Sequence, residues 1–313
     1  MQRCVADNIT HPSSRGDKKA LALLWKEIFG DADAFVNLFF SSMYKPANAL
    51  IIRDRDTIVS ALYILPYRVK IGVRTFPSAY ICGVCTRPSE RGKGYMKALM
   101  QAAMDEIRSK GYVLATLIPA NERVRDFYRR ISFTLPLNYS VEVCKKHKVL
   151  PSNFNFSPSN FYLSPSNFYI LHSTFNSSTF NSSMAFAYFD RKQRQRYCTI
   201  LHKASDFENI IRDLANDGGG VWTVQNDEDC IQAIAFAKPV SKTQCEIAEL
   251  FSDDCHYEEI LVQHIIKELK VKTAIVRHPS KSAENKENNY GLACILNDNL
   301  PPVIDLHISL MLD

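Results

Sequence analysis

The sequence predicts an α/β (α+β) fold that occurs twice along one chain. Two observations carry this prediction. Each half of the chain shows the same order of patterns, a helix, three strands, a helix and a further strand. Between the halves lies a run of short proline-containing repeats that matches neither pattern. Each half is therefore expected to form a central mixed, mostly antiparallel sheet flanked by helices.

The first half opens with two helical patterns. Apolar residues recur at helical spacing over residues 21–29 and 35–40. Asp31 and Asp33, which lie between them, are of the residue type that caps helix N-termini. A meander of three strand patterns follows, at residues 50–52, 58–65 and 67–73.

A basic, glycine-rich turn then joins a buried strand at residues 79–84 to an amphipathic helix. The turn reads Arg91-Gly92-Lys93-Gly94, and the helix carries apolar residues over 96–107. A helix N-terminus presents backbone N–H groups at the positive end of its dipole, and glycines allow a phosphate to approach the main chain. The turn therefore predicts an anion site. The spacings of nucleoside triphosphatase and dinucleotide-binding loops are both absent.

The order continues downstream of this helix. Gly111 ends the helix, and residues 112–118 form the next strand pattern. Asn121 then leads a short helix over 124–130 that contains Tyr128.

Residues 84–96 resemble a motif of the GNAT superfamily of acetyl-CoA-dependent N-acetyltransferases, a strand ending Val-x-Thr-x-Pro followed by Arg-x-x-Gly-x-Gly/Ala. Met96 stands where the family has a small residue, and Ser132 stands where glycine is usual in the Tyr-x-x-x-Gly-Phe ending of the short helix. The resemblance covers about residues 18–145. Within the superfamily, residues 25–31 and 62–67 are most similar to the multi-domain Eis-like (enhanced intracellular survival) branch.

The resemblance implies acetyl-CoA as co-substrate and a site without metal. Tyr128 is the implied general acid that protonates the departing thiolate, which suits a phenol within hydrogen-bond reach of the sulfur. In Eis-like enzymes the carboxylate at the chain terminus enters the active site, which implies a catalytic role for Asp313. The residues implied to bind the cofactor are Val84, Cys85, Thr86, Arg91, Gly92, Lys93, Gly94, Tyr95, Met96 and Asn121.

Composition limits the partners and the compartment. The formal net charge of +5 is mild, so we expect no nucleic-acid partner. No apolar run approaches the roughly 18–20 residues that span a bilayer, and the polar N-terminus lacks the apolar block of a secretion signal. Nine dispersed cysteines, an odd number, indicate a reducing compartment, so we expect a cytoplasmic protein without a membrane partner. Whether it is a homo-oligomer is left open.

The pair Cys82-x-x-Cys85 lies inside the predicted strand. Positions three apart on a strand point to opposite faces unless a bulge intervenes. No second pair with zinc-like spacing occurs, so we interpret these cysteines as packing residues, with Cys85 able to line an acetyl-binding crevice.

The middle of the chain is a low-complexity segment. Three near-identical heptads occupy residues 150–156, 157–163 and 164–170, and two copies of Ser-Thr-Phe-Asn-Ser follow. Proline in every heptad excludes a coiled coil. The segment is either a linker enlarged by duplication or an aromatic recognition segment, and we favour the linker. The predicted division is a tail at 1–17, a catalytic domain at 18–149, a linker at 150–183 and a degenerate domain at 184–313.

The second half differs from the first at its strand–helix turn. Residues 252–256 contain no glycine and include two acids, Asp253 and Asp254, which would repel a pyrophosphate. We therefore expect the second domain to be a degenerate copy that does not bind CoA. The alternating pattern over 304–313 predicts a terminal strand.

The resemblance implies an enzyme that transfers an acetyl group to a primary amine by direct attack within a ternary complex. The acceptor is open among an aminoglycoside-like polyamine, another small amine and a protein lysine. Two alternatives remain. One is a non-catalytic CoA-binding or interaction protein. The other is a tandem aminoacyl transferase acting with a charged tRNA, against which the Arg-x-x-Gly turn in the first domain argues.

Overall fold

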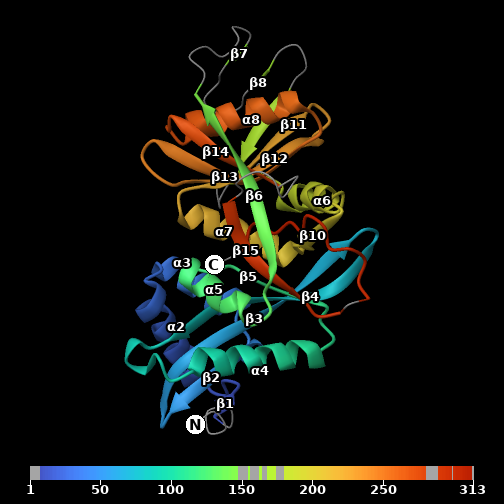
Figure 1. Cartoon of the computed structure of the whole chain (residues 1–313). Helices are drawn as coiled ribbons and strands as arrows, with labels where there is room; N and C mark the ends of the chain where they lie inside the picture. The colour runs from blue at the N-terminus through green and yellow to red at the C-terminus, as the bar shows by residue number, and fades with distance from the viewer. Residues whose placement is uncertain are drawn as a thin grey trace. The chain divides into compact units, whose positions relative to one another are not determined.

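A computed structural model describes residues 8–146, 154–155, 162–163, 168–173, 180–279, 288–297 and 299–311. The chain forms two compact units (Figure 1). Among the described residues, unit 1 runs to Leu137 and resumes over Asn289–Leu306, and unit 2 comprises Asn138–Asn288 and His307–Met311. None of the described helices combines the length and the hydropathy that crossing a bilayer requires.

Unit 1 is built on a mixed sheet with strand order β1-β2-β3-β4-β5-β15. Only β4 and β5 are parallel, with Ser78 opposite Leu114, and the other neighbouring strands are antiparallel. Its strands are β1 (Ile9–Thr10), β2 (Ala49–Asp54), β3 (Thr57–Ile71), β4 (Arg74–Thr86), β5 (Leu114–Leu117) and β15 (Asn288–Ile295). Its helices are α2 (Arg15–Phe29), α3 (Asp33–Leu38), α4 (Tyr95–Ser109) and α5 (Glu122–Arg129), with short helical turns at Phe39–Met43, Pro46–Asn48 and Pro88–Glu90.

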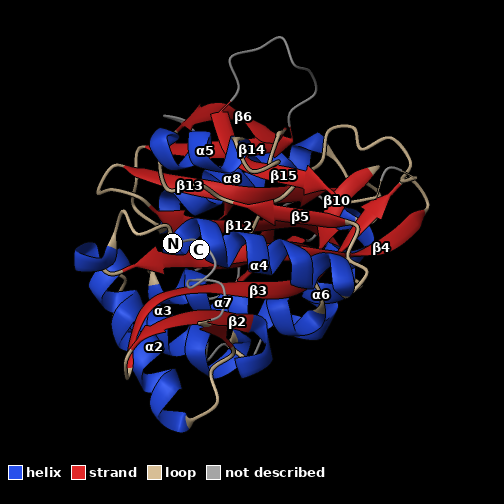
Figure 2. Ribbon diagram, turned by 60° about the horizontal axis from the view of Figure 1, so that its bottom comes forward, coloured by secondary structure: helices blue, strands red, loops and turns tan. Residues whose placement is uncertain are grey.

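Helices cover both faces of this sheet, and Figure 2 shows α4 lying along its strands. Side chains alternate along β3, so Leu62 and Ile64 pack into one core with α4 and α5. Tyr63, between them, faces the opposite side, where its ring lies 5.4 Å from that of Trp25 on α2. The two cores hold β4 between them, which fixes the strand that carries the candidate site.

The start of unit 1 differs from the sequence prediction in two places. The segment expected as a tail contributes β1 and the first turn of α2. Ser14 caps this helix, because its hydroxyl accepts a hydrogen bond from the Asp17 N–H while the Asp17 carboxylate accepts one from the Ser14 N–H. Neither Asp31 nor Asp33 caps α3, whose N-cap is Ala32 and makes no side-chain hydrogen bond. Asp31 instead accepts a hydrogen bond of 2.7 Å from the Trp25 indole, so a tertiary contact took the place of the local cap.

The strands of the meander are also longer than predicted. The patterns at 58–65 and 67–73 belong to one strand, β3, because Pro66 keeps its place in the ladder opposite Ala79. The chain reverses at Gly72, whose φ of 59° is a left-handed conformation that glycine adopts more easily than other residues. Strand β4 then begins at Arg74.

Unit 2 repeats the plan of unit 1, with strand order β6-β14-β13-β12-β11-β9. Along this order of described strands, β13 and β14 pair in parallel, as β4 and β5 do in unit 1. Its strands are β6 (Leu135–Lys145), β9 (Phe168–His172), β10 (Cys198–Leu201), β11 (Gly220–Asn226), β12 (Ile231–Pro239), β13 (Gln244–Ser252) and β14 (Thr273–Pro279). Its helices are α6 (Ser182–Gln193), α7 (Ala204–Asn216) and α8 (Cys255–Glu268). The predicted order of a second, similar domain is therefore present.

Two strands belong to the unit opposite to the one that their place in the sequence suggests. From Asn138 onward, β6 belongs to unit 2, where it pairs with β14, and β15 belongs to unit 1, where it pairs with β5. Part of the predicted linker is also structural, since β9, from the third heptad, pairs with β11. From the first two heptads, Phe154–Asn155 (β7) pairs with Tyr162–Leu163 (β8). The last residues of the predicted linker, Ser182 and Ser183, begin α6, and apart from 173, 180 and 181 the other linker positions lie outside the described residues.

The predicted terminal strand over 304–313 is wrong for its described part. The segment makes a single bridge, between Thr199 and His307, and positive φ angles at Asp305 and Leu310 break the extended alternation. Its anchor is the buried carboxylate of Glu249, which accepts a hydrogen bond of 2.8 Å from His307. Asp313 lies outside the described residues.

Candidate functional site

The end of β4 carries a bulge at the centre of the candidate site. Tyr63 pairs with Cys82 and Ala61 with Cys85, so the intervening residues do not match one for one. Gly83 has a φ of 57°, and a Cβ on it would lie 2.7 Å from Tyr63 Cδ2 and would overlap the Trp25 ring. Glycine is therefore required here, and the bulge takes neighbouring main-chain groups out of the regular ladder.

Polar contacts fix the strand beyond the bulge. The Ser60 hydroxyl on β3 donates a hydrogen bond of 2.7 Å to the Cys85 carbonyl and lies 2.8 Å from the Thr86 hydroxyl. Val84, the residue between bulge and strand end, is partly buried against the core that contains Tyr128. Val84, Cys85 and Thr86, three of the residues implied to bind the cofactor, are thus held at the end of β4.

The basic turn after β4 is exposed and open. Gly92 and Gly94 have φ angles of 81° and 82°, a conformation that side chains rarely adopt. Apart from the glycine itself and its two chain neighbours, no described residue has an atom within 4 Å of the Cβ position at either glycine, so main-chain groups of the turn can be approached from outside. Arg91 Nε lies 3.4 Å from the Thr86 carbonyl oxygen, and Lys93 Nζ lies 2.7 Å from Glu90 Oε2, a hydrogen bond that raises the pKa of Lys93.

Helix α4 begins at this turn without a side-chain cap. Its N-cap is Gly94, and the first hydrogen bond across the turn runs from the Ala98 N–H to the Gly94 carbonyl, at 3.0 Å. The N–H groups of Tyr95, Met96 and Lys97 precede that bond, so they have no acceptor within the helix. Unpaired amides, a helix dipole and flanking cations together form an anion-binding site.

Helix α5 places Tyr128 beside the bulge. Asn121 is the N-cap of α5, and its side-chain oxygen accepts a hydrogen bond of 3.1 Å from the Val124 N–H. Tyr128 is 4% exposed, and burial raises the pKa of its phenol, with the Cys82 and Cys85 thiols raising it further. The phenol is therefore protonated at neutral pH, the state that a proton donor needs.

The two cysteines flank the bulge and are both buried. Both act on the pKa of Tyr128, so the bulge brings them near the same ring. Burial raises the pKa of Cys85 to about 12, which keeps it a neutral thiol rather than a nucleophile. Within the described residues, no group of three or more candidate ligands is placed to hold a metal ion.

The corresponding turn of unit 2 is closed. Helix α8 has Asp254 as its N-cap, and that carboxylate accepts a hydrogen bond of 2.7 Å from the His256 N–H. Asp253 lies 2.7 Å from Lys192 Nζ and 3.6 Å from Arg191, both on α6. The positive end of this helix is therefore already matched by protein carboxylates.

The structure thus gathers most of the predicted site residues in two adjoining places. Val84 and Cys85 lie near Tyr128 at the bulge, Thr86 follows them at the end of β4, and residues 91–96 form the open turn. The side-chain oxygen of Asn121 is engaged as a helix cap. Sequence reasoning missed Gly83 and Ser60, although a glycine between two strand cysteines is a signal for a bulge.

Residues 10–135 match the model of the acetyltransferase (GNAT) domain family. No curated protein matches the sequence. Among solved structures, a probable N-acyltransferase from Enterococcus faecalis V583 is similar over 92% of this chain and 72% of its own, with a TM-score of 0.69 and 13% identity.

Two further structures share the fold. A GCN5-related N-acetyltransferase from Anabaena variabilis has a TM-score of 0.67 at 13% identity, and Eis1 from Mycobacterium abscessus has one of 0.62 at 11% identity. Each similarity covers 92% of this chain and 73% of the other. The resemblance to the Eis-like branch is consistent with the last of these folds.

Proposed function

We propose that unit 1, whose residues 10–135 match the model of the acetyltransferase (GNAT) domain family, transfers the acetyl group of acetyl-CoA to a primary amine. The observation that carries the proposal is the pairing of an open anion site with a buried, protonated phenol. The first lies at the N-terminus of α4 and the second, Tyr128, beside the bulge in the strand that leads into that helix.

In this proposal the turn binds the pyrophosphate of the co-substrate. The N–H groups at the start of α4 donate to phosphate oxygens, Gly92 and Gly94 permit close approach, and Arg91 adds positive charge. The side chain at Met96 is larger than the residue usual in the family, but it belongs to the first turn of the helix and its N–H group still precedes the first intrahelical bond. Asn121 borders the co-substrate at the start of α5.

The chemistry is a direct transfer. The acceptor nitrogen attacks the thioester carbonyl carbon, and main-chain N–H groups near Val84 to Thr86 stabilise the developing oxyanion. As the carbon–sulfur bond breaks, Tyr128 donates its proton to the sulfur. An amine with a pKa near 10 must first lose a proton to a base or an ordered water. The proposed carboxylate for that step is Asp313, which lies outside the described residues.

Isothermal titration of acetyl-CoA into the whole chain tests the co-substrate site. We expect a dissociation constant on the order of micromolar for the wild type and a loss of about 100-fold or more in Gly94→Asp, which adds a carboxylate to the anion site. Gly111→Asp is the matched control, because Gly111 has a φ of 71° with open space and lies at the other end of α4. Equal weakening in both variants, or no binding by the wild type, would refute the proposal.

Turnover is tested separately by following the release of the CoA thiol with three acceptors, an aminoglycoside, a polyamine and a lysine-containing peptide. Acetyl-CoA binding with no turnover of any amine would support a non-catalytic CoA-binding protein instead. A measured turnover assigns the acceptor class.

A further inference from the structure

Unit 2 lacks one helix that unit 1 has. In unit 1, α5 packs beside α4 over β5 and β15, with Val124, Phe127 and Tyr128 in the same core as Leu292 and Cys294. In unit 2 the equivalent strands are β14 and β6, beside α8. Among the described residues no helix follows β14, so the same face of these two strands is left uncovered.

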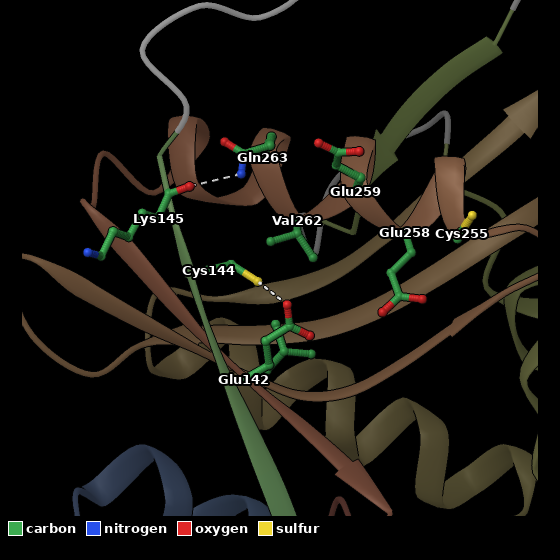
Figure 3. Close-up of a pocket in the computed structure, with 9 residues that line it drawn as sticks. Glu142, Cys144, Lys145, Cys255, Glu258, Glu259, Val262 and Gln263 are labelled. Atoms are coloured by element: carbon green, nitrogen blue, oxygen red, sulfur yellow. Dashed lines mark hydrogen bonds between the residues drawn. The ribbon is translucent and has the colours of Figure 1, made fainter.

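A cavity of about 360 Å³ occupies this place (Figure 3). All of its lining residues belong to unit 2 and come from β6, α8 and β14. This volume falls in the range of roughly 300–1,000 Å³ that is typical of small-molecule sites. The lining residues are Glu142, Cys144, Lys145, Cys255, Glu258, Glu259, Val262, Gln263 and Val276.

The base of the cavity is apolar. Val262 on α8 is 4% exposed and Val276 on β14 is 1% exposed, and both belong to the main core of this face. Cys144 packs against the same core. The Gln263 amide donates a hydrogen bond of 3.0 Å to the Lys145 carbonyl, which ties the end of β6 to α8 and fixes one wall.

The rim of the cavity is acidic. Figure 3 shows the carboxylates of Glu142 and Glu258 directed into the same space, with the Lys145 ammonium pointing away from it. Glu142 Oε1 lies 3.7 Å from Cys144 Sγ, and its other oxygen lies 3.3 Å from His278 Nε2. Burial and the charges of Glu142, Glu258 and Glu259 together raise the pKa of the Cys144 thiol to about 11, so three carboxylates lie near this thiol.

We propose that this cavity binds a small organic dication, an alkyl diamine whose methylene chain lies on the Val262–Val276 base and whose ammonium groups pair with Glu142 and Glu258. The site requires no part of the proposed acetyl transfer. The carboxylates exclude an anionic ligand, and the apolar base distinguishes the cavity from a fully hydrated acidic surface. Its position follows from the helix that unit 1 has and the described part of unit 2 lacks.

The test is the titration of putrescine into the whole chain, with butanediol as the neutral analogue of equal carbon number. We expect putrescine to bind and butanediol not to bind. In Glu142→Gln/Glu258→Gln the affinity for putrescine falls at least tenfold. Asp227→Asn/Glu228→Gln is the control, because it removes two exposed charges from the β11–β12 turn of the same unit.

A local readout separates this cavity from an amine site elsewhere in the protein. Cys255 lines the cavity and is exposed, so its alkylation by a maleimide, followed by peptide mass spectrometry, should slow when putrescine is present. Cys230, exposed elsewhere in unit 2, should react at an unchanged rate. Unchanged alkylation of Cys255, equal binding of butanediol, or full affinity in the glutamine variant would each overturn the proposal. Acetyl-CoA titration of the same variant should match the wild type, so a failure here is distinct from a failure of the proposed function.

Discussion

The two strand–helix turns of this protein occupy the same position in two similar units and differ in what they leave available. In unit 1 the turn contains two left-handed glycines, and α4 starts with no side-chain cap. In unit 2 the turn contains two aspartates, one capping α8 and the other paired with Lys192. Both helices have the same positive dipole end, but only at the first turn is that end not already matched by a protein carboxylate, so only there can it bind an external anion.

The comparison extends to the neighbouring helix. Unit 1 has α5 with Tyr128 beside its turn, whereas the described part of unit 2 has a cavity with an acidic rim in that place. In our two proposals, a few residues decide whether one fold offers a site for a phosphate or a site for a cation. The backbone plan alone does not determine the ligand.

The largest expected effect is on catalysis. Tyr128→Phe keeps the ring in its core but removes the proton donor, so we expect kcat to fall by about 10²–10⁴-fold, with acetyl-CoA affinity within about twofold of the wild type. Steady-state kinetics and titration measure the two quantities. Tyr112→Phe is the control, since Tyr112 also packs against this core but carries no proposed role. Full activity in Tyr128→Phe would show that Tyr128 is not the proton donor, and this proposed chemical difference between the units would be wrong.

The pH profile sharpens the same point. Burial raises the pKa of Tyr128 above its ordinary value of 10.0, so the phenol keeps its proton, and its capacity as an acid, through pH 10. We therefore expect no alkaline fall in kcat from this group below about pH 10. An alkaline limb below pH 9 that disappears in Tyr128→Phe would contradict the raised pKa.

A stability effect of a few kcal/mol is expected at the bulge. Gly83→Ala adds a methyl group that overlaps Trp25 and Tyr63, at a φ that favours glycine, so unfolding free energy should fall by about 2–4 kcal/mol. Gly92→Ala has a similar positive φ with open space, so it should cost only about 1 kcal/mol. Urea denaturation measures both. Equal losses would show that packing against Trp25 contributes nothing.

A smaller loss is expected at the closed turn. Asp254→Ala removes the cap of α8 and should lower the stability of the chain by about 1 kcal/mol. The stoichiometry of acetyl-CoA binding should stay the same, since Asp253 and its lysine pair remain. Thermal unfolding and titration give the two results. A second equivalent of bound acetyl-CoA in this variant would show that the cap alone separates the two turns.

The smallest effect is a gain. Ser132 follows α5 with a φ of 83°, at the position where glycine is usual in the motif that this segment resembles, and its side chain is exposed. Ser132→Gly relieves this strain and should raise unfolding free energy by about 0.5–1 kcal/mol. Denaturation of the variant measures it. A loss of stability would mean that the serine makes a compensating contact.

Local patterns predicted the helices and strands around the candidate site better than they predicted the pairing of the sheet. The strand, glycine turn, α4, β5 and α5 were confirmed, because each depends on contiguous residues whose periodicity and turn chemistry are visible in the sequence. The exchange of β6 and β15 was not predicted, because strand partners are set by contacts far apart in the chain. The terminal strand failed where Asp305 and Leu310 adopt positive φ, which alternation of apolar residues does not reveal.

The exchanged strands affect how the protein can be made. The sheet of unit 1 includes β15, so the first half of the chain cannot complete its sheet until the ribosome has added nearly 300 residues. Until then the outer edge of β5 lacks its final partner, an exposed edge of the kind that promotes aggregation. The last strand of unit 1 therefore arrives only after most of unit 2 has been synthesised. A nascent chain that stalls in unit 2 would accordingly leave both units incomplete.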